Sequence, residues 1–312
     1  MNKRIVGIAT RGSKLALYQA TRVKEELENH FRNLTFEIKV VKTQGDKILD
    51  VALSKIGDKG LFTKELEVML LEGEADIAVN SLKDMPTELP EGLVIGGVLK
   101  RGDVRDALVS VKGRKLGELD ETDILATSSL RRIAQLRNLN KKIKIIDIRG
   151  NVDSRIRKMS EGYCTAQVMA AAGLERLGFA GLITEYLDPF KMLPAVGQGA
   201  IAIEIREDDE LSVSLMKAVN DEETMLAVSA ERVFLRELEG GCQIPVGCYS
   251  EIIGNKYRIT GFVSNPDGTG VMSDVEEDLK ENAGDAALKL AGRFIEKGAD
   301  VLIRNIRSSA GL

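Results

Sequence analysis

The sequence has one histidine, His30, and three cysteines, Cys164, Cys242 and Cys248. A serine or cysteine nucleophile activated by histidine would have to use His30, which lies in the predicted helix "TRVKEELENHF". Such a catalytic system is therefore disfavoured. Without further histidines, Cys242 and Cys248 are too few for a zinc site, and we expect no metal. Acid–base chemistry is left to carboxylates, lysines or backbone groups.

The sequence also lacks long apolar runs and a strong excess of charge. Nowhere do about 18 apolar residues follow one another, and the first residues, "MNKRIVGIATRGS", show no signal-peptide pattern. We therefore expect a cytoplasmic protein that binds no membrane. With 44 basic and 48 acidic residues the formal net charge is −4, which argues against nucleic acid as a partner but does not exclude a local basic cleft.

The length of 312 residues exceeds what one hydrophobic core usually supports, so two or three domains are expected. The strand-like run "RIVGIA" precedes a helical pattern over residues 14–31, and "FEIKVV" and "ADIAVNS" follow as strands. From about residue 100 the same order starts again with "RDALVSV", "ATSSLRRIAQLRNL" and "KIKIIDI". Alternating strands and helices predict parallel pairing, and hence two α/β lobes.

Two further segments bear on the domain organisation. The segment "LPAVGQGAIAIEIR" is expected to return the chain to the first lobe, and a last helix is expected to cover three short strands near the C-terminus. The fold class is thus α/β with three domains, the third a small α+β domain with an antiparallel three-stranded sheet. The predicted boundaries are residues 1–99 with 199–218, residues 100–198, and residues 219–312.

Cations and hydroxyls gather at four predicted strand-to-helix turns, "TRGSK", "NSLKD", "TSSLRR" and "DIRGNVDSR". In open α/β sheets ligands bind where strands end, and arginine holds carboxylate or phosphate through two parallel hydrogen bonds. No GxxxxGK[ST] phosphate loop is present, so a polycarboxylate ligand is favoured. Solvated surface arginines are the alternative. The candidate residues are Arg11, Ser13, Lys83, Thr127, Ser129, Arg131, Arg132, Arg149 and Arg155.

Two more residues stand out by their surroundings. Asp84 in "SLKDMP" is either a carboxylate that stabilises a cationic intermediate or moves a proton, or a turn-forming residue. Cys242 in "LEGGCQIPVG" lies between two glycines and Pro245, a frame that an inert core cysteine rarely needs. The segment "KTQGDKILDVALSKIGDKG" is either a functional loop or a solvated one.

Taken in order, these motifs resemble the porphobilinogen deaminase family, also called hydroxymethylbilane synthases. The resemblance runs from about residue 4 to the C-terminal helix. The segments that carry it are "TRGSKLALYQA", "GDKGLFTKELEVMLLEGEADIAVNSLKDMPTELP", "ATSSLRRIAQL", "DIRGNVDSRIRK", "AAAGLERLG", "LPAVGQGAIAIE" and "LEGGCQIPVG".

The resemblance implies a three-domain fold whose first two domains resemble periplasmic binding proteins, with the site in the cleft between them. It implies that Cys242 carries a dipyrromethane cofactor through a thioether. Four porphobilinogen molecules would be joined to this primer with loss of ammonia, and water would release hydroxymethylbilane. The implied partners are porphobilinogen and uroporphyrinogen-III synthase, which would take the product, and the chain is expected to be a monomer.

The resemblance also assigns roles to the residues. Asp84 would be the catalytic acid, and Lys55 and Lys59 would lie in a loop that closes over the substrate. Cofactor or substrate carboxylates would be bound by Arg11, Ser13, Lys83, Thr127, Ser129, Arg131, Arg132, Arg149, Arg155 and Arg176.

The sequence departs from the family pattern in two places. Asn80 stands where many members of the family have histidine. Cys164, Thr165 and Gln167 replace an aromatic-Asp-Ala pattern of the family, which puts the local packing of the second lobe in question. A two-lobed binding protein without catalytic activity for a polycarboxylate is the alternative function, and a nucleic-acid binder is a third. Intact-protein mass spectrometry distinguishes the enzyme from the binding protein, because only the enzyme carries a primer.

Overall fold

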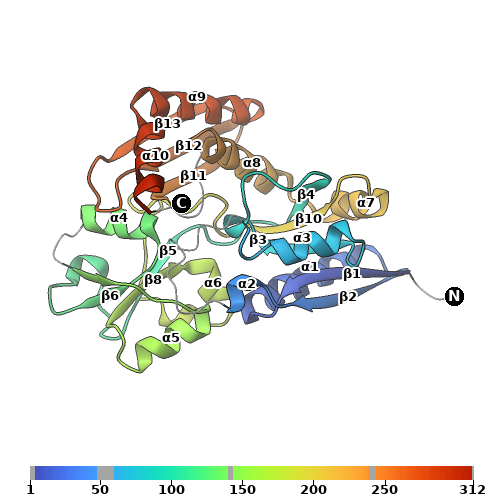
Figure 1. Ribbon diagram of the computed structural model, residues 1–312, viewed down its shortest axis with the longest axis horizontal. Coiled ribbons are helices and arrows are strands. Elements are labelled where there is room, and N and C mark those ends of the chain that lie inside the picture. Colours follow the sequence, from blue (N-terminus) through green and yellow to red (C-terminus); the bar gives the residue numbers. More distant parts are fainter. Residues whose placement is uncertain (1–3, 48–59, 140–142, 239–243, 311–312) are drawn as a thin grey trace. The chain divides into compact units, whose positions relative to one another are not determined.

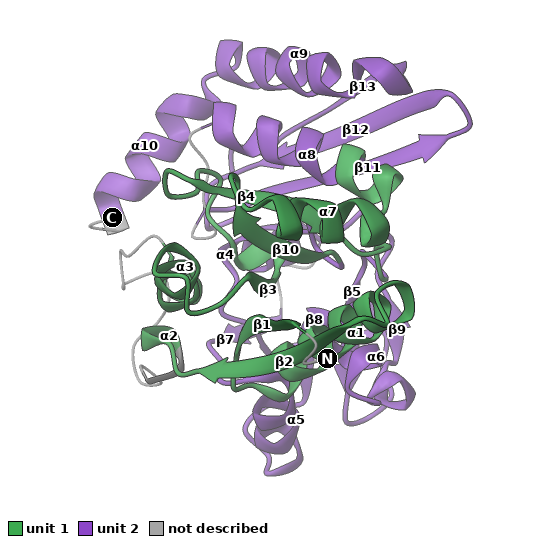
Figure 2. Ribbon diagram, turned by 90° about the vertical axis from the view of Figure 1, so that its right-hand side faces the viewer, with its two compact units in different colours: residues 1–49, 58–102, 200–226 green, residues 50–57, 103–199, 227–312 purple. Residues whose placement is uncertain are grey.

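The computed structural model describes residues 4–47, 60–139, 143–238 and 244–310. These residues form two compact units (Figure 2). Unit 1 holds the described residues up to 102 together with 200–226, and unit 2 holds 103–199 and the residues from 227 onward.

Unit 1 contains a five-stranded sheet (Figure 1). The first strand along the chain pairs in parallel with both the second and the third strand. The strand that returns from residue 200 pairs antiparallel with both its neighbours. In order across the sheet the strands are β2 (Leu34–Val41), β1 (Arg4–Arg11), β3 (Ile77–Ser81), β10 (Ile201–Arg206) and β4 (Leu93–Val98).

Alternating side chains of these strands pack against helices on the two faces of the sheet. On one face Ile8 and Ile77 cluster with Val23 of helix α1 (Lys14–His30), and on the other Ala9 and Ala78 cluster with Leu66 of helix α3 (Lys64–Leu71). This period of two is what strands buried on both faces require. The helices of unit 1 are α1 (Lys14–His30), α2 (Gln44–Lys47), α3 (Lys64–Leu71) and α7 (Glu210–Val219), with the short 3-10 turn η2 (Leu82–Asp84).

Unit 2 contains a second five-stranded sheet with the same plan of three parallel strands followed by two antiparallel pairings. In order its strands are β7 (Lys144–Ile146), β6 (Ile124–Ala126), β8 (Ala166–Ala170), β5 (Asp106–Ser110) and β9 (Glu185–Tyr186). Its helices are α4 (Leu130–Leu139), α5 (Val152–Ser160) and α6 (Ala171–Arg176), with the short turns η3 (Leu116–Glu118) and η4 (Ala180–Leu182).

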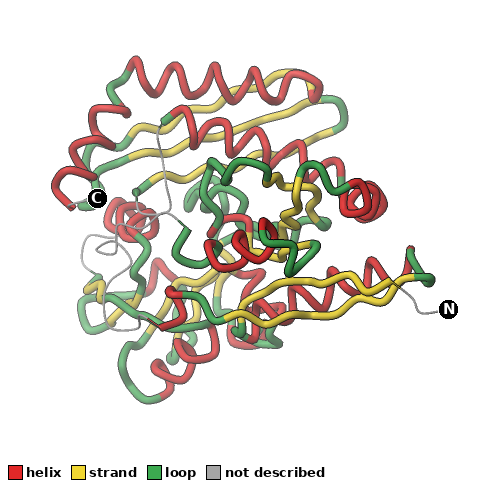
Figure 3. The backbone as a smooth tube through the Cα atoms, turned by 45° about the vertical axis from the view of Figure 1, so that its right-hand side comes forward, coloured by secondary structure: helices red, strands yellow, loops and turns green. Residues whose placement is uncertain are grey.

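The C-terminal part of unit 2 is an antiparallel sheet with helices packed on it (Figure 3). Its strands are β11 (Val246–Ile253), β12 (Lys256–Val263) and β13 (Met272–Leu279), and its helices are α8 (Glu222–Glu237), which begins in unit 1, α9 (Ala283–Glu296) and α10 (Ala299–Ala310), with the turn η5 (Lys280–Asn282). The predicted α/β fold class with a small three-stranded antiparallel sheet is confirmed.

Two details differ from the expectations. A short helix, α2, opens the segment predicted as a loop, and the chain continues beyond the expected last helix into α10. Gly298 ends α9 at a φ of +85°, which glycine adopts at little cost, and the amphipathic run that follows forms a further helix. No helix within the described ranges is long and apolar enough to cross a membrane.

Candidate functional site

In unit 1 the candidate residues lie at one edge of the sheet, because β1 and β3 are parallel and both end there. Arg11 is the last residue of β1, and its guanidinium lies 4.1 Å from the centre of the Phe62 ring. Ser13 caps helix α1 by accepting a hydrogen bond from the Ala16 N–H at 3.2 Å. Stacking on the Phe62 ring restricts where the Arg11 charge can lie.

Asp84 follows β3 in the turn η2 at the same edge. The turn is anchored on both sides by buried residues, Leu82 and Met85, and the Leu82 N–H donates to the carbonyl of Ala200 at 3.1 Å. Between these anchors Lys83 is partly buried and Asp84 is exposed. The turn thus presents a carboxylate to solvent on a short and well-fixed stretch of backbone.

In unit 2 the strand ends again meet at one edge, and β6 leads directly into the hydroxyl-rich start of α4. The Thr127 hydroxyl accepts from the Ser129 N–H at 3.3 Å, and the Ser129 hydroxyl accepts from the Arg132 N–H at 3.5 Å. These bonds satisfy N–H groups that the first turn of a helix leaves without partners. They also direct Arg131 and Arg132 toward the edge where β5 begins.

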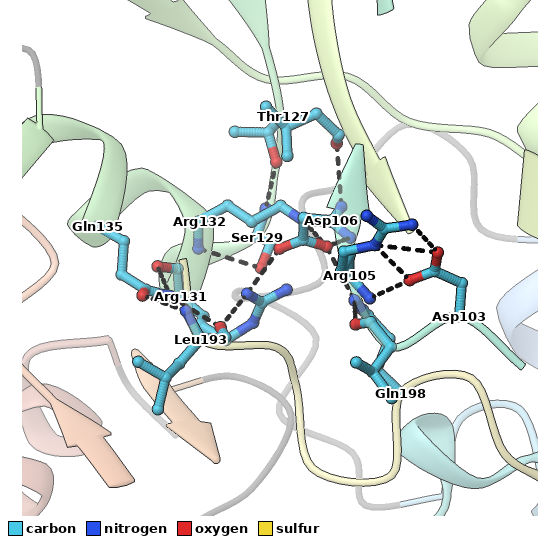
Figure 4. Close-up of polar contacts among 12 residues, drawn as sticks. Asp103, Arg105, Asp106, Thr127, Ser129, Arg131, Arg132, Gln135, Leu193 and Gln198 are labelled. Atoms are coloured by element: carbon cyan, nitrogen blue, oxygen red, sulfur yellow. Dashed lines mark hydrogen bonds and ion pairs between the residues drawn. The ribbon is translucent and has the colours of Figure 1, made fainter. Parts of the chain in front are cut away.

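Asp106, the first residue of β5, is fully buried between these two arginines (Figure 4). It accepts hydrogen bonds from Arg131 Nη1 at 2.8 Å and from Arg132 Nη2 at 2.7 Å and Nε at 3.1 Å. The Gln198 side chain donates a further bond at 3.0 Å. Burial by itself would raise the pKa of Asp106, but the charges of Arg131 and Arg132 outweigh it and hold the pKa well below its ordinary value.

The two arginines differ in what this network leaves available. Arg132 also donates to the Val168 carbonyl at 3.0 Å, so each of its three guanidinium nitrogens makes a hydrogen bond and three of its five N–H donors are engaged. Arg131 donates to Asp106 and to the Leu193 carbonyl, in both cases through Nη1. Within the described residues, Nη2 of Arg131 makes no hydrogen bond that involves this network. Burial lowers the pKa of Arg131, and Asp106 opposes that shift.

The loop after β7 carries Arg149 and leads into α5, which carries Arg155. Gly150 lies between them at a φ of +118°, where a side chain would be strained. Arg155 Nε donates to the Gly150 carbonyl at 2.7 Å, and Lys158 Nζ donates to the Arg149 carbonyl at 3.0 Å. Burial lowers the pKa of Arg149, with Asp147 acting in the opposite direction. The backbone of this loop is therefore tied to its own helix.

Arg176 ends helix α6, which follows β8 at the same edge, and its Nη2 donates to the Gly199 carbonyl at 2.6 Å. Unit 2 thus brings together Thr127, Ser129, Arg131, Arg132, Arg149, Arg155 and Arg176, and unit 1 brings together Arg11, Ser13, Lys83 and Asp84. Cys242, Lys55 and Lys59 lie outside the described residues.

The segment that departs from the family pattern is held by hydrogen bonds, but Gln167 Oε1 is buried without a hydrogen-bond partner among the described residues. The Thr165 hydroxyl accepts from the Ile124 N–H at 2.9 Å and donates to Asp123 at 3.0 Å, and Gln167 Nε2 donates to the Arg155 carbonyl at 2.7 Å. Cys164 is buried, and burial raises the pKa of its thiol despite a hydrogen bond with Gln167. The other departure, Asn80, is buried with its Nδ2 lacking a hydrogen-bond partner among the described residues.

Three contributors to this edge were missed in the sequence: Asp106, Gln198 and the Leu193 carbonyl. One signal for Asp106 was available, since an acid at the start of the apolar strand "DALVS" is almost never fully buried without a cationic partner. No comparable signal exists for a main-chain carbonyl. Within the described residues, no group of three or more His, Cys, Asp or Glu side chains could hold a metal ion.

Comparison with known proteins identifies the family of the chain. Residues 6–214 match the family model "Porphobilinogen deaminase, dipyromethane cofactor binding domain", and residues 225–296 match "Porphobilinogen deaminase, C-terminal domain". The porphobilinogen deaminase of Syntrophomonas wolfei is 47% identical over 300 residues, covering 96% of this chain and 98% of that protein. That of Pelotomaculum thermopropionicum is 48% identical over 309 residues, with 98% of each covered.

Among solved structures, the substrate-binding domain of a putative molybdenum ABC transporter from Clostridium difficile is similar, at 11% identity and a TM-score of 0.45, over 72% of this chain and 95% of that one. The family assignment rests instead on the two family models and on the relatives at nearly full length. The chain belongs to the porphobilinogen deaminase family.

Proposed function

We propose that the protein is a hydroxymethylbilane synthase, a transferase that joins four porphobilinogen molecules head to tail on a covalently bound dipyrromethane and releases the linear tetrapyrrole after attack by water. The observation that carries this proposal is the full-length family match, in which the expected cations recur at the strand ends of a chain with a net negative charge.

The residues of unit 2 fit a dipyrromethane, which presents acetate and propionate groups. Fixed guanidinium groups are the donors that suit several carboxylates in one place. Arg131 keeps Nη2 outside the Asp106 network, and Arg149 and Arg155 follow the next parallel strand at the same edge. When bound, the dipyrromethane supplies the pyrrole carbon to which the first substrate ring is joined.

We assign the cofactor contacts to Lys83, Asp84, Thr127, Ser129, Arg131, Arg132, Arg149 and Arg155, with Cys242 as the covalent attachment. Arg132 belongs to this set through its charge and its support of Asp106, to which two of its five N–H donors are bound. The substrate contacts are assigned to Arg11, Ser13, Lys55, Lys59, Arg149, Arg155 and Arg176.

Asp84 is assigned the catalytic role. Loss of ammonia from porphobilinogen leaves a cation, and a fixed carboxylate stabilises the transition state that leads to it. The exposed position of Asp84 between two buried anchors supports this role, because the carboxylate can reach a ligand without reorganising the turn. The same oxygen atoms can accept the pyrrole N–H groups and carry protons between steps.

The remaining assignments rest on the family. The chain is proposed to be a cytoplasmic monomer whose product passes to uroporphyrinogen-III synthase. The division into residues 1–99 with 199–218, residues 100–198 and residues 219–312 is supported by three separate sheets and by the break between the two family models.

The test is the variant Asp84→Asn. It keeps the shape of the side chain and loses the charge, so the protein should fold and carry its primer while turnover of porphobilinogen falls below about a tenth of the wild-type rate. Glu88→Gln, at an exposed acid in the same connection, is the control and should turn over normally. A rate above that tenth in Asp84→Asn would remove Asp84 from the catalytic role.

A further inference from the structure

Gln135 makes an unusual contact in the second lobe. It lies one helical turn after Arg131 on α4, so both side chains project from the same face. The side chain is 3% exposed, and its amide pairs with both polar main-chain groups of one residue. Nε2 donates to the Leu193 carbonyl at 3.0 Å, and Oε1 accepts from the Leu193 N–H at 2.7 Å (Figure 4). These two hydrogen bonds, one donated and one accepted by Gln135, fix its side-chain amide against the main chain of Leu193.

The same carbonyl receives Arg131. Arg131 Nη1 donates to the Leu193 oxygen at 2.6 Å and to Asp106 at 2.8 Å. A carbonyl oxygen has two lone pairs, and here Arg131 and Gln135 fill them. The position of the Arg131 guanidinium therefore depends on where Gln135 holds Leu193.

Strand β11, which begins within the motif "LEGGCQIPVG", contacts Leu193 and the residue after it, Pro194. The Cys248 N–H in β11 donates to the Pro194 carbonyl at 3.0 Å. Beside it, Gly247 approaches so closely that an added Cβ would lie 2.9 Å from the Leu193 Cβ and 3.1 Å from the Leu193 oxygen. Only glycine fits there without displacing the segment. This explains the last residue of the motif "LEGGCQIPVG".

We propose that Gln135 is a positioning residue: by clamping Leu193 it fixes the segment Leu193–Pro194, against which both Arg131 and the start of β11 are held. It thereby fixes the guanidinium of Arg131, which we propose binds carboxylates, relative to strand β11, which begins at the end of the motif that carries Cys242. This inference rests on the proposed function, in particular on the role of Arg131.

The experiment compares Gln135→Met with Thr165→Val. Methionine fills the space of glutamine but loses both bonds to Leu193. Valine fills the space of threonine but loses the bonds to the Ile124 N–H and to Asp123 elsewhere in unit 2. Both variants leave one main-chain N–H without its partner, so both should lose thermal stability to a similar degree. The readouts are the fraction of purified protein that carries the primer, and the KM and kcat of the loaded fraction.

In Gln135→Met we expect a lower loaded fraction and a KM for porphobilinogen raised about tenfold, with kcat changed much less. A displaced Arg131 holds the carboxylates of the primer less firmly, and the substrate binds against the primer, so binding of substrate and transition state weakens alike. Thr165→Val should match the wild type in all three. If Gln135→Met does not fold, Gln135→Glu serves, since it keeps the acceptor for the Leu193 N–H and loses the donor.

A KM and a loaded fraction within about twofold of Thr165→Val would overturn the positioning role. A wild-type protein without primer and without turnover would instead overturn the proposed function, and this inference with it.

Discussion

Asp106 shows how one buried carboxylate organises a cationic edge. Its side chain is inaccessible to solvent, yet it accepts bonds from Arg131, Arg132 and Gln198. Two guanidinium groups placed side by side would repel each other, and the carboxylate between them removes one of the two positive charges. The remaining positive charge is the one that we propose a ligand carboxylate meets.

The variant Asp106→Asn should therefore be strongly destabilised. Removing one partner of a buried ion pair leaves uncompensated charge, and the expected loss is about 3–5 kcal/mol in the free energy of unfolding. Asp103→Asn is the matched control, because Asp103 pairs with Arg105 at a site where the arginine side chain is 40% exposed, and its loss should cost about 1 kcal/mol or less. Urea unfolding measures both. Equal losses in the two variants would contradict the role given to Asp106.

At the level of single residues, the sequence predicted where the cations lie but not their burial or their hydrogen-bond partners. Arg131 and Arg132 were predicted from their place at the start of a helix, and both do lie there. That they are buried and share Asp106 depends on pairing between β5 and β8, which are separated by about sixty residues. Short-range patterns carry no information about such a contact, and the same holds for Gln135 and Leu193.

Among the elements, β13 and α9 form a ladder of ion pairs. Lys297 donates to Asp274, Arg293 to Asp274 and Glu276, and Lys289 to Asp278. Acids at every second position of a strand face one way, and bases four apart on a helix face one way, so the two periods match. The ladder also keeps β13, an outer strand of its sheet, covered with charge, which discourages pairing with other chains.

This ladder predicts a pH dependence. The hydrogen bond from Lys297 lowers the pKa of Asp274, and those from Lys289 and Asn282 lower that of Asp278. Groups with a lowered pKa in the folded state stabilise it above their unfolded pKa of about 3.9, and this contribution is lost as the pH falls below that value. Thermal melts from neutral to acidic pH should show a smaller acid-induced loss in Asp274→Asn/Asp278→Asn than in the wild type. Parallel curves would count against the ladder.

A second prediction at this scale concerns two glycines. Gly261 of β12 faces the edge-to-face pair of Phe234 and Phe294, and an added Cβ would lie 2.6 Å from the Phe234 ring. Gly261→Ala should cost about 1–3 kcal/mol through overpacking. Gly292→Ala on α9 meets nothing within 4 Å and should stabilise by about 0.5–1 kcal/mol. Calorimetry distinguishes the two, and a neutral Gly261→Ala would show that the ring pair yields freely.

The elements were largely predictable because they follow local rules. Strands such as "RIVGIA" and helices such as residues 14–31 can be predicted from the spacing of their apolar residues, and α1 begins where Ser13 caps it. The strand order was not predictable in full. β10 and β5 pair antiparallel inside otherwise parallel sheets, and only long-range packing decides that.

At the scale of the whole molecule, we propose that an acidic chain gathers permanent cations to hold an oligopyrrole attached to its own Cys242. The charges of Arg131, Arg149 and Arg155 lie at one sheet edge of unit 2, although the chain as a whole has a net charge of −4. The proposed binding of an anionic ligand therefore depends on this local arrangement of cations and not on the net charge.

The most direct test is the mass of the intact protein before and after incubation with porphobilinogen, with Cys242→Ser as the control. The purified wild type should exceed the mass of the bare chain by one dipyrromethane, and substrate should add further rings in single steps. The Cys242→Ser protein should keep the mass of the bare chain throughout. A folded wild-type protein with the bare mass in both samples, or a Cys242→Ser protein that still gains pyrrole rings, would contradict the account.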